Sequence, residues 1–421
     1  GASAIVSNKR VKIKNHQIPL LLVKDVRKSL SEACSNFYKK KPPNIIAVTG
    51  TNGKSSVADF FYQILNLNKI SVASIGTLGI LSKNYNKKIK LTSIDPLSLH
   101  KNLQILKKNK INNVILEASS HGLDQKRLDN LNIRVGIFTN LSHDHLDYHK
   151  NMKSYFNSKM YLFKNLLTKN SIIITDNEIN EFKTIKNISN KKKIKTTTIG
   201  KTFGDLKILQ HRYKGNKQIV RISINSKICL LEIPLIGYFQ IKNLLIAVLA
   251  ALSCGLKPNK IFQTIPKIKP VSGRLECVAN LNNNSSIILD FAHTPNALEQ
   301  SLIAKLNWAD AHGMRSRILT QWSLDATAVN SWIERLRALG FKQPVHVGIP
   351  GPATLKALLR YATVCGVKTS TQVLKRQGLS LGRLLLINKP DQLINDLRGY
   401  DQLHLFPFGG LARTTEWLKQ R

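Results

Sequence analysis

Short apolar runs alternate with amphipathic stretches along the chain between residues 44 and 265. The runs are rich in β-branched side chains, as in buried strands of a parallel sheet, and the stretches between them have helical periodicity. The alternation predicts an α/β fold whose mostly parallel sheet is covered by helices on both faces. The expected strands are Ile45–Val48, Val72–Ile75, Val114–Ala118, Val135–Asn140 and Ser171–Thr175, and the expected helices are 55–67, 96–109, 151–167 and 239–254.

The segments on either side of this region have their own patterns. Residues 1–43 predict a short α/β piece, with a strand at Pro19–Val23 and a helix at Val26–Tyr38. Residues 205–233 alternate apolar and polar positions, which is typical of antiparallel strands. Pro266 and Pro270 indicate a linker, after which a strand at Ile287–Phe291 and a helix at Asn296–Leu302 begin a second α/β domain.

After residue 302 the alternation resumes while the residue usage changes. Residues 1–302 hold 40 Lys and 7 Arg, whereas residues 303–421 hold 7 Lys, 10 Arg and all four Trp. We interpret this change as a join between two segments of different ancestry. The later segment predicts strands at 316–321, 345–349 and 402–407 and helices at 326–339, 352–365 and 411–420.

The composition narrows the possible classes of protein. A formal net charge of +40 is compatible with nucleic-acid binding, but the lysines are spread along the chain without an accompanying nucleic-acid motif, so we expect no nucleic-acid partner. No run approaches the ~20 apolar residues of a membrane span. The five scattered cysteines lack metal-site spacing and indicate reduced thiols. We therefore expect a cytoplasmic monomer.

The most informative motif is N-I-I-A-V-T-G-T-N-G-K-S-S-V at residues 44–57. It places a buried strand before a glycine-rich turn and a helix after it. The two glycines permit close approach of a phosphate chain, Lys54 can neutralise its oxygens, and Ser55 can bind Mg²⁺. The usual phosphate-loop pattern would have glycine where Val48 stands, so a chance Gly-Lys-Ser turn is the alternative.

Two further clusters follow expected strands. Glu117 ends one strand, where a carboxylate near a phosphate loop is a natural Mg²⁺ ligand, although such a residue alone is more often a solvated loop or cap residue. Residues 139–149 carry three histidines and two aspartates in T-N-L-S-H-D-H-L-D-Y-H. A zinc hydrolase is one interpretation, but oxygen-rich groups beside a phosphate loop favour Mg²⁺ and phosphoryl transfer.

Seven motifs occur in the order found in Mur ligases, and residues 1–302 resemble this family. The resemblance is nearest to the members that add the third residue of the peptidoglycan stem peptide. The motifs are G-T-N-G-K-S-S, E-A-S-S-H-G-L-D-Q-K-R, T-N-L-S-H-D-H-L-D-Y-H, Y-F-N-S-K-M-Y-L-F, G-Y-F-Q-I-K-N-L-L, S-G-R-L-E and D-F-A-H-T-P.

The resemblance implies a role for each matching residue. Residues implied in ATP binding are Gly50, Thr51, Asn52, Gly53, Lys54, Ser55, Ser56, Asn243, Arg274 and Asp290. Mg²⁺ ligands are implied at Ser55, Glu117, His145 and Lys159, where Lys159 matches a lysine that the family carbamylates. Lys54, Glu117, His145 and Lys159 are implied to be catalytic. Contacts to a UDP-muramoyl-dipeptide are implied at Thr92, Ser93, Ser120, Gln125 and Arg127.

The implied reaction is ATP-dependent formation of an acyl phosphate on the D-Glu carboxylate, followed by attack of an amino acid amine. The implied layout is a remnant of the UDP-binding domain at 1–43, the central phosphate-loop domain at 44–270 and the start of a truncated last domain at 271–302. The family's D-N-P-R-type motif has no counterpart, and Gln240 stands where many members have Asn. We therefore expect ATP and Mg²⁺ binding to persist and ligation to be impaired.

Residues 303–421 resemble the C-terminal part of methylenetetrahydrofolate reductases, which are flavin-dependent (β/α) barrels. The resemblance rests on L-T-Q-W-S-L, Q-P-V-H-V-G-I-P-G-P, A-L-L-R-Y-A-T-V-C-G and the run at 402–418, with Gln321 matching a residue near the folate. It implies a partial barrel. A generic α/β domain is the alternative, and we expect no reductase activity and no flavin. The chain as a whole is then a Mur-type ligase, a reductase fragment or a non-catalytic ATP-binding fusion.

Overall fold

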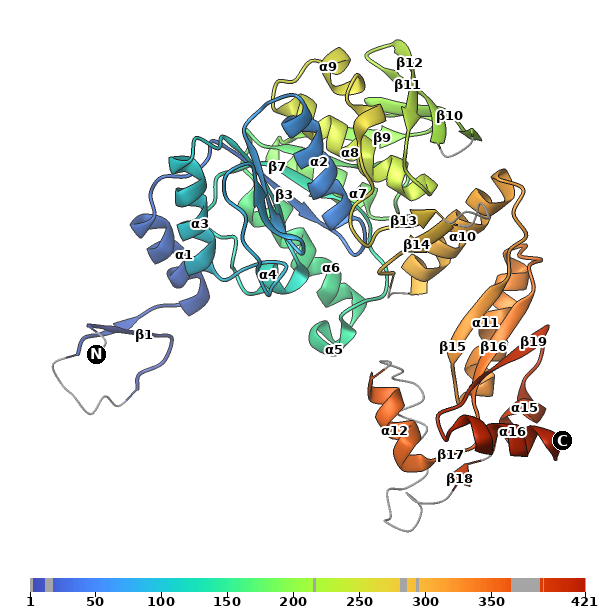
Figure 1. Cartoon of the computed structure of the whole chain (residues 1–421). Helices are drawn as coiled ribbons and strands as arrows, with labels where there is room; N and C mark the ends of the chain where they lie inside the picture. The colour runs from blue at the N-terminus through green and yellow to red at the C-terminus, as the bar shows by residue number, and fades with distance from the viewer. Residues whose placement is uncertain are drawn as a thin grey trace. The chain divides into compact units, whose positions relative to one another are not determined.

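The computed structural model describes residues 3–11, 18–214, 217–280, 286–292, 295–364, 387–388 and 390–420 (Figure 1). The chain divides into two compact units, Gly1–His312 and Gly313–Arg421. Within the described ranges, no helix combines the length and the apolar character needed to cross a membrane. Each unit is described by itself below.

The first unit is built on one large sheet. Its strands are β3 (Asn44–Thr49), β4 (Val72–Gly76), β5 (Gly79–Ser82), β6 (Asn113–Glu117), β7 (Ile133–Phe138), β8 (Ile172–Asp176), β9 (Lys195–Gly200), β10 (Leu206–Lys214), β11 (Lys217–Ile224) and β12 (Lys227–Ile233). In the described residues their order is β12-β11-β10-β9-β8-β7-β3-β6-β4-β5. The pairs from β10–β9 to β6–β4 are parallel. Antiparallel pairs lie at both ends of the sheet.

Helices cover both faces of this sheet (Figure 1). They are α2 (Lys54–Leu67), α3 (Pro96–Lys108), α4 (Ser120–Asp124), α5 (Leu146–His149), α6 (Met152–Tyr161), the π-helix η1 (Leu162–Leu166), α7 (Phe182–Lys192), α8 (Tyr238–Ser253), α9 (Pro258–Phe262) and the 3₁₀ helix η2 (Ile265–Lys267). The alternation of side chains along β3 separates two cores. Ile46 and Val48 pack in the core that contains α2 and α8, whereas Ile45 and Ala47 pack in the core that contains α3 and α6.

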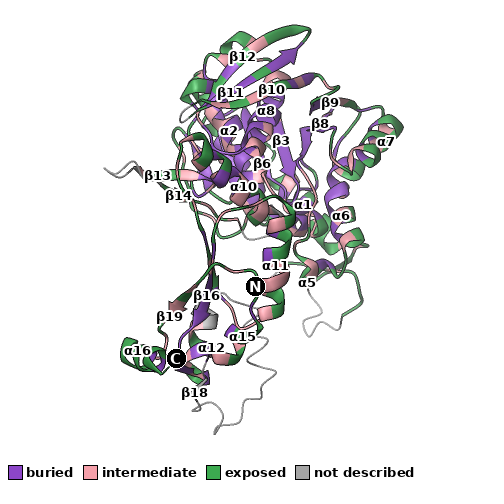
Figure 2. Ribbon diagram, turned by 90° about the vertical axis from the view of Figure 1, so that its right-hand side faces the viewer, coloured by how far each residue is buried: buried purple, intermediate pink, exposed green. Residues whose placement is uncertain are grey.

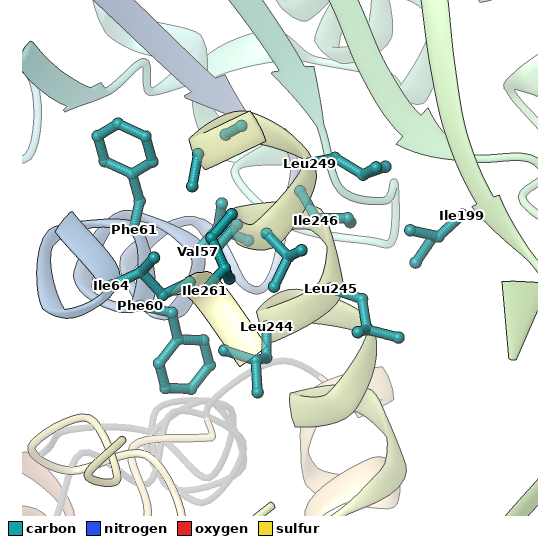
Figure 3. Packing of buried hydrophobic residues seen from close by; sticks show 14 of the residues in the cluster. Val57, Phe60, Phe61, Ile64, Ile199, Leu244, Leu245, Ile246, Leu249 and Ile261 are labelled. Atoms are coloured by element: carbon teal, nitrogen blue, oxygen red, sulfur yellow. The ribbon is translucent and has the colours of Figure 1, made fainter. Parts of the chain in front are cut away.

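The centre of the sheet is the most deeply buried part of the first unit (Figure 2). In Figure 3 the aromatic and aliphatic side chains of α2 lie beside the leucines and isoleucine of α8. Because every residue of β3 after Asn44 is buried, the strand can be apolar along its whole length. This packing fixes the direction in which β3 delivers the chain to the turn before α2.

Shorter elements flank the sheet within the first unit. They are β1 (Ile5–Ser7), β2 (Leu20–Leu22), α1 (Val26–Phe37), the hairpin β13 (Glu276–Asn280) and β14 (Ser286–Leu289), and α10 (Pro295–Ala311). Helix α10 continues through residue 302, and the two units divide ten residues after the change in residue usage. The change in residue usage therefore falls inside a helix, and no boundary between compact units coincides with it.

The second unit contains a small sheet with the order β15-β16-β19, and both of its strand pairs are parallel. Its elements are β15 (Ile318–Trp322), α11 (Ala326–Ala338), β16 (Val345–Pro350), β17 (Ala353–Thr354), α12 (Leu355–Val364), β18 (Ile387–Asn388), α15 (Asp391–Asp396), β19 (Gln402–Phe406) and α16 (Leu411–Lys419). Trp322 and Leu358 lie at the centre of its core. The described residues of this unit form a three-stranded sheet and give no support to the expected partial barrel.

The predicted α/β class and the mostly parallel sheet are confirmed. The helix expected at 151–167 is instead α6 followed by the π-helix η1. The strands β5 and β9 were not predicted, because each is short or polar in sequence and is stabilised by its neighbour in the sheet. Four of the five cysteines lie in the described residues, and all four are free thiols.

Candidate functional site

A cavity of about 300 Å³ lies at the end of β3 in the first unit. It collects residues from segments that are far apart in the sequence. The residues singled out above that line it are Thr51, Asn52, Gly53, Lys54, Ser55, Ser56, Thr92, Glu117, Ser120, His145, Lys159, Asn243, Arg274 and Asp290. Gly50, Ser93, Gln125 and Arg127 do not line it, and His293, the histidine of the D-F-A-H-T-P motif, lies outside the described residues.

Two glycines give the turn between β3 and α2 its shape. Gly50 has a φ of 145°, and a Cβ there would lie 1.9 Å from the Thr139 hydroxyl oxygen. Gly53 has a φ of 85°, and a Cβ there would lie 2.5 Å from Asn243 Oδ1. Both positions therefore exclude a side chain on steric grounds as well as by backbone conformation. The turn leads directly into the N-terminus of α2, whose first N–H groups are available to an anion.

The turn is fastened by the segment that follows β7. The Thr51 and Asn52 amides donate to the carbonyl and side-chain oxygens of Asn140, at 2.9 Å each. The Thr139 hydroxyl donates to the Asn52 carbonyl at 2.6 Å. Thr139 and Asn140 thus shape the loop, a role that the sequence analysis missed. Their position directly after a strand of the sheet was the available signal.

Lys54 folds back over the turn. Its amine donates to the carbonyls of Gly50 and Thr51 at 2.9 and 2.7 Å. Burial lowers the pKa of Lys54, while the charges of Glu117 and Asp144 raise it and the charge of Arg274 lowers it. Lys54 and Arg274 are therefore two mutually repelling cations at one cavity.

Glu117 lies at the base of the cavity and is only 3% exposed. Its carboxylate accepts hydrogen bonds from the Ser55 hydroxyl at 2.9 Å and from the Thr77 amide at 2.7 Å. Two hard oxygen donors, one neutral and one anionic, are thus adjacent at the first turn of α2. Together with phosphate and water oxygens, this pair suits Mg²⁺. Thr77 is a further residue of this site that the sequence analysis did not identify.

His145 and Lys159 approach the cavity from the following segments. His145 has a φ of 51°, its Nε2 lies 3.4 Å from Asp144, and burial lowers its pKa. Lys159 is 1% exposed and donates to the Gly50 carbonyl at 2.7 Å. Burial is the main cause that lowers the pKa of Lys159 well below its usual range, and the charge of Lys54 adds to it.

The four residues expected to bind Mg²⁺ thus share one cavity, but only Ser55 and Glu117 are joined directly. In the described part of the chain, no group of three or more His, Cys, Asp or Glu side chains has the geometry to hold a metal ion by itself. A magnesium site here would be completed by the oxygens of a bound nucleotide.

The sequence profile of the Mur ligase middle domain matches residues 48–251, which include the phosphate loop and most of these residues. The central part of the chain is thus similar to the middle domain of Mur ligases. Two similar proteins are named UDP-N-acetylmuramoyl-L-alanyl-D-glutamate–2,6-diaminopimelate ligase. The one from Rickettsia bellii is 40% identical over 72% of this chain and 63% of its own length. The one from Brucella melitensis is 36% identical over 72% of this chain and 62% of its own length.

Solved Mur ligase structures have a similar fold. One 2,6-diaminopimelate ligase has a TM-score of 0.66 at 23% identity, covering 97% of this chain and 81% of its own. The MurF ligase of Thermotoga maritima in complex with ADP has a TM-score of 0.59 at 17% identity, covering 100% and 88%. The likeness in fold extends past residue 302, whereas the chain spans less than two thirds of the length of the relatives matched in sequence. The comparisons give no support to the expected resemblance to methylenetetrahydrofolate reductase.

Most residues that family resemblance assigns to the muramoyl-dipeptide support one another. The Ser93 hydroxyl donates to the Glu117 carbonyl at 2.8 Å and accepts from the Ser119 amide. Arg127 donates to the Ser93 carbonyl and to Gln125. Ser93, Gln125 and Arg127 therefore hold the chain around Glu117. Thr92 and Ser120 line the cavity itself, and the buried Ser120 hydroxyl makes no hydrogen bond within the described residues.

The residues assigned to the nucleotide lie on α8 and on the segment after it. Asn243 donates to Gln240 at 3.1 Å, and Gln240 donates to the Arg274 carbonyl at 3.2 Å. Arg274 in turn donates to the Phe291 carbonyl, and Asp290 accepts from the Leu275 amide, at 3.2 Å each. Gln240, where many Mur ligases have Asn, thus links α8 to the Arg274 backbone.

Proposed function

We propose that this chain is an ATP- and Mg²⁺-dependent ligase of peptidoglycan synthesis. It would activate the D-Glu carboxylate of UDP-N-acetylmuramoyl-L-alanyl-D-glutamate and join an amino acid to it. The observation that carries the proposal is the Ser55–Glu117 oxygen pair, 2.9 Å apart, in one cavity with Lys54 and Arg274. The names of the relatives support 2,6-diaminopimelate as the amino acid.

The first half of the reaction follows from this arrangement. The turn at Gly50–Gly53 and the N-terminus of α2 would bind the ATP phosphates. Lys54 and Arg274 would stabilise the negative charge that develops as the carboxylate attacks the γ-phosphate and ADP leaves. Ser55, Glu117 and His145 would hold Mg²⁺, which when bound polarises the phosphoryl oxygens.

Lys159 would contribute after modification. Its buried amine has a strongly lowered pKa, and the neutral amine is the form that adds CO₂. The resulting carbamate would turn a cation beside Gly50 into an anionic oxygen donor. In the second half of the reaction, the incoming amine attacks the acyl phosphate carbon and phosphate leaves. The protein's part in this half is to hold the two reactants together.

The finer assignments are part of the proposal. These are the layout 1–43, 44–270, 271–302 and 303–421, a cytoplasmic monomer, and binding of the muramoyl-dipeptide near Thr92 and Ser120. The sequence lacks a D-N-P-R-type motif, so we expect phosphate transfer to the carboxylate to be stronger than ligation. The flavin-dependent alternative has no structural observation in its favour and is not adopted.

Calorimetry with a non-hydrolysable ATP analogue tests the nucleotide site. Wild-type protein should bind it with Mg²⁺, and Lys54→Ala should bind about tenfold or more weakly, since charged hydrogen bonds contribute about 1.5–3 kcal/mol each. ADP formation from ATP should then require the muramoyl-dipeptide, and phosphate release that also depends on added diaminopimelate would indicate ligation. Wild-type protein that fails to bind the Mg²⁺–nucleotide would refute the proposal.

A further inference from the structure

A glutamine on α2 contacts a segment more than two hundred residues away. The Gln63 side-chain amide donates to the Lys269 carbonyl at 3.0 Å and accepts from the Lys269 amide at 2.8 Å. A primary amide thus pairs with a peptide group in the same two-bond pattern as neighbouring strands. The second N–H of Gln63 is used as well, because the same nitrogen donates to the Asp59 carboxylate at 2.6 Å. Asp59 therefore determines which way the Gln63 amide faces.

Lys269 lies in the connection that leads to Arg274. Ile268 and Val271, on either side of this contact, are 2% and 1% exposed and pack in the same core as α2. Val271 then accepts a hydrogen bond from the Arg274 amide at 2.9 Å, which closes the turn that carries Arg274. The backbone from Lys269 to Arg274 is thus short and ordered by hydrogen bonds, so its position at Lys269 is transmitted to Arg274.

Helix α2 therefore fixes both sides of the nucleotide cavity. Its first turn holds Lys54 and Ser55, and Gln63 lies about 13 Å farther along the same helix at 1.5 Å per residue. Arg274 and Lys54 repel one another, as the effect of Arg274 on the pKa of Lys54 indicates. A guanidinium facing another cation needs a firm backbone attachment to keep its place.

We propose that Gln63, oriented by Asp59, is a positioning residue that holds Arg274 at the nucleotide cavity through the backbone of Lys269. The inference rests on the proposed nucleotide-binding function. It adds a second attachment for Arg274, besides the Gln240 hydrogen bond to the Arg274 carbonyl.

The test is a double-mutant cycle in the full chain, read by calorimetry with Mg²⁺ and a non-hydrolysable ATP analogue. Gln63→Ala should raise the dissociation constant about five- to tenfold, as expected for the loss of about two hydrogen bonds. In an Arg274→Ala background the same change should have less than about a twofold effect, because residues that act through one another are not additive. Hydrogen exchange at the Lys269 amide should become faster in Gln63→Ala.

Gln104→Ala is the matched control. Gln104 is another half-buried glutamine of the first unit, on α3, and its side chain also accepts a backbone hydrogen bond, from the Lys40 amide at 3.3 Å. It does not line the cavity, so its removal should leave nucleotide affinity unchanged.

The outcomes separate the two proposals. Normal nucleotide binding by Gln63→Ala, or additive effects of Gln63→Ala and Arg274→Ala, would overturn the positioning role while leaving the proposed function intact. Faster exchange at Lys269 with unchanged affinity would have the same meaning, since the contact would then be structural only. Wild-type protein that binds no nucleotide would remove the proposed function and this inference together.

Discussion

Replacing Asp59 by asparagine should stabilise the protein, and the size of the effect should depend on pH. Burial is the main cause that raises the pKa of Asp59 from 3.8 to about 6, opposed by the hydrogen bond from Gln63, while the charge of Glu117 raises it further. A carboxyl whose pKa is raised on folding contributes stability below its unfolded pKa and loses it as pH rises through the folded value. Ionised Asp59 therefore weakens the native state at neutral pH.

The magnitude follows from the displacement of the pKa. A rise from 3.8 to about 6 corresponds to about 3 kcal/mol at pH 8, at 1.36 kcal/mol per pKa unit. Linkage reduces the difference to about 1.6 kcal/mol at pH 5, because Asp59 is then mostly protonated in the native protein while it is still mostly ionised in the unfolded chain. Asparagine cannot ionise, and its side-chain oxygen can still accept the hydrogen bond from Gln63.

Urea unfolding at pH 5 and pH 8, followed by far-ultraviolet circular dichroism, measures this difference. Hydrogen exchange of the α2 amides assigns it to the first unit. Asp310→Asn, an exposed change on α10, is the control and should alter stability by less than about 0.5 kcal/mol at either pH. A gain from Asp59→Asn that is equal at both pH values, or a loss at pH 8, would contradict the reasoning, because it could not come from the ionisation of Asp59.

Three further changes test the cavity. Gly53→Ala places a Cβ 2.5 Å from Asn243 Oδ1 at a φ of 85°, so calorimetry should show nucleotide binding weakened more than about tenfold, with a stability loss of about 1–3 kcal/mol by urea unfolding. Glu117→Gln keeps an acceptor for the Thr77 amide but removes the anion, so nucleotide binding should lose its dependence on added Mg²⁺; retained dependence would place the ion elsewhere. Lys159→Met should abolish phosphate release and yet stabilise the fold at pH 7. A buried amine whose pKa is lowered on folding favours the unfolded state below its usual pKa of 10.5. The gain in stability from Lys159→Met should therefore shrink as the pH approaches 10.5, which a pH series of urea titrations would measure.

Local patterns in the sequence predicted much of the fold of the first unit. The run at 45–48 is apolar because β3 is buried on both faces, and the glycines after it are required by the close approaches of Thr139 and Asn243. The apolar run and the spacing of the glycines are local patterns, so both could be recognised in the sequence without knowledge of the distant contacts. The π-helix η1 is not, since its wider turn is defined by packing in the sheet core rather than by a residue pattern.

Sequence analysis predicted the site residues that lie in motifs with a characteristic chemical function. It missed the residues that act through partners distant in the sequence. Lys54, Ser55 and Glu117 could be proposed because strand ends meet at one edge of a parallel sheet. Thr77 contacts Glu117 through its backbone amide and its hydroxyl, and neither contact has a sequence signature. Ser93 and Arg127 match family positions, yet in this fold they support Glu117 from outside the cavity.

Helix α2 shows why the remainder depends on the three-dimensional structure. Asp59 and Gln63 are four residues apart and would pass for an ordinary hydrogen-bonded pair on a helix surface. Their proposed role depends on the hydrogen bonds of Gln63 to Lys269, whose position is fixed by the burial of Ile268 and Val271 beside the same helix. Ile268 and Val271 are buried whereas Lys269 between them is exposed, and the sequence by itself indicates only a connection after η2. In the fold, that connection leads to Arg274 at the cavity. The placement of the Arg274 guanidinium therefore depends on the side-chain amide of Gln63, nine residues after Lys54.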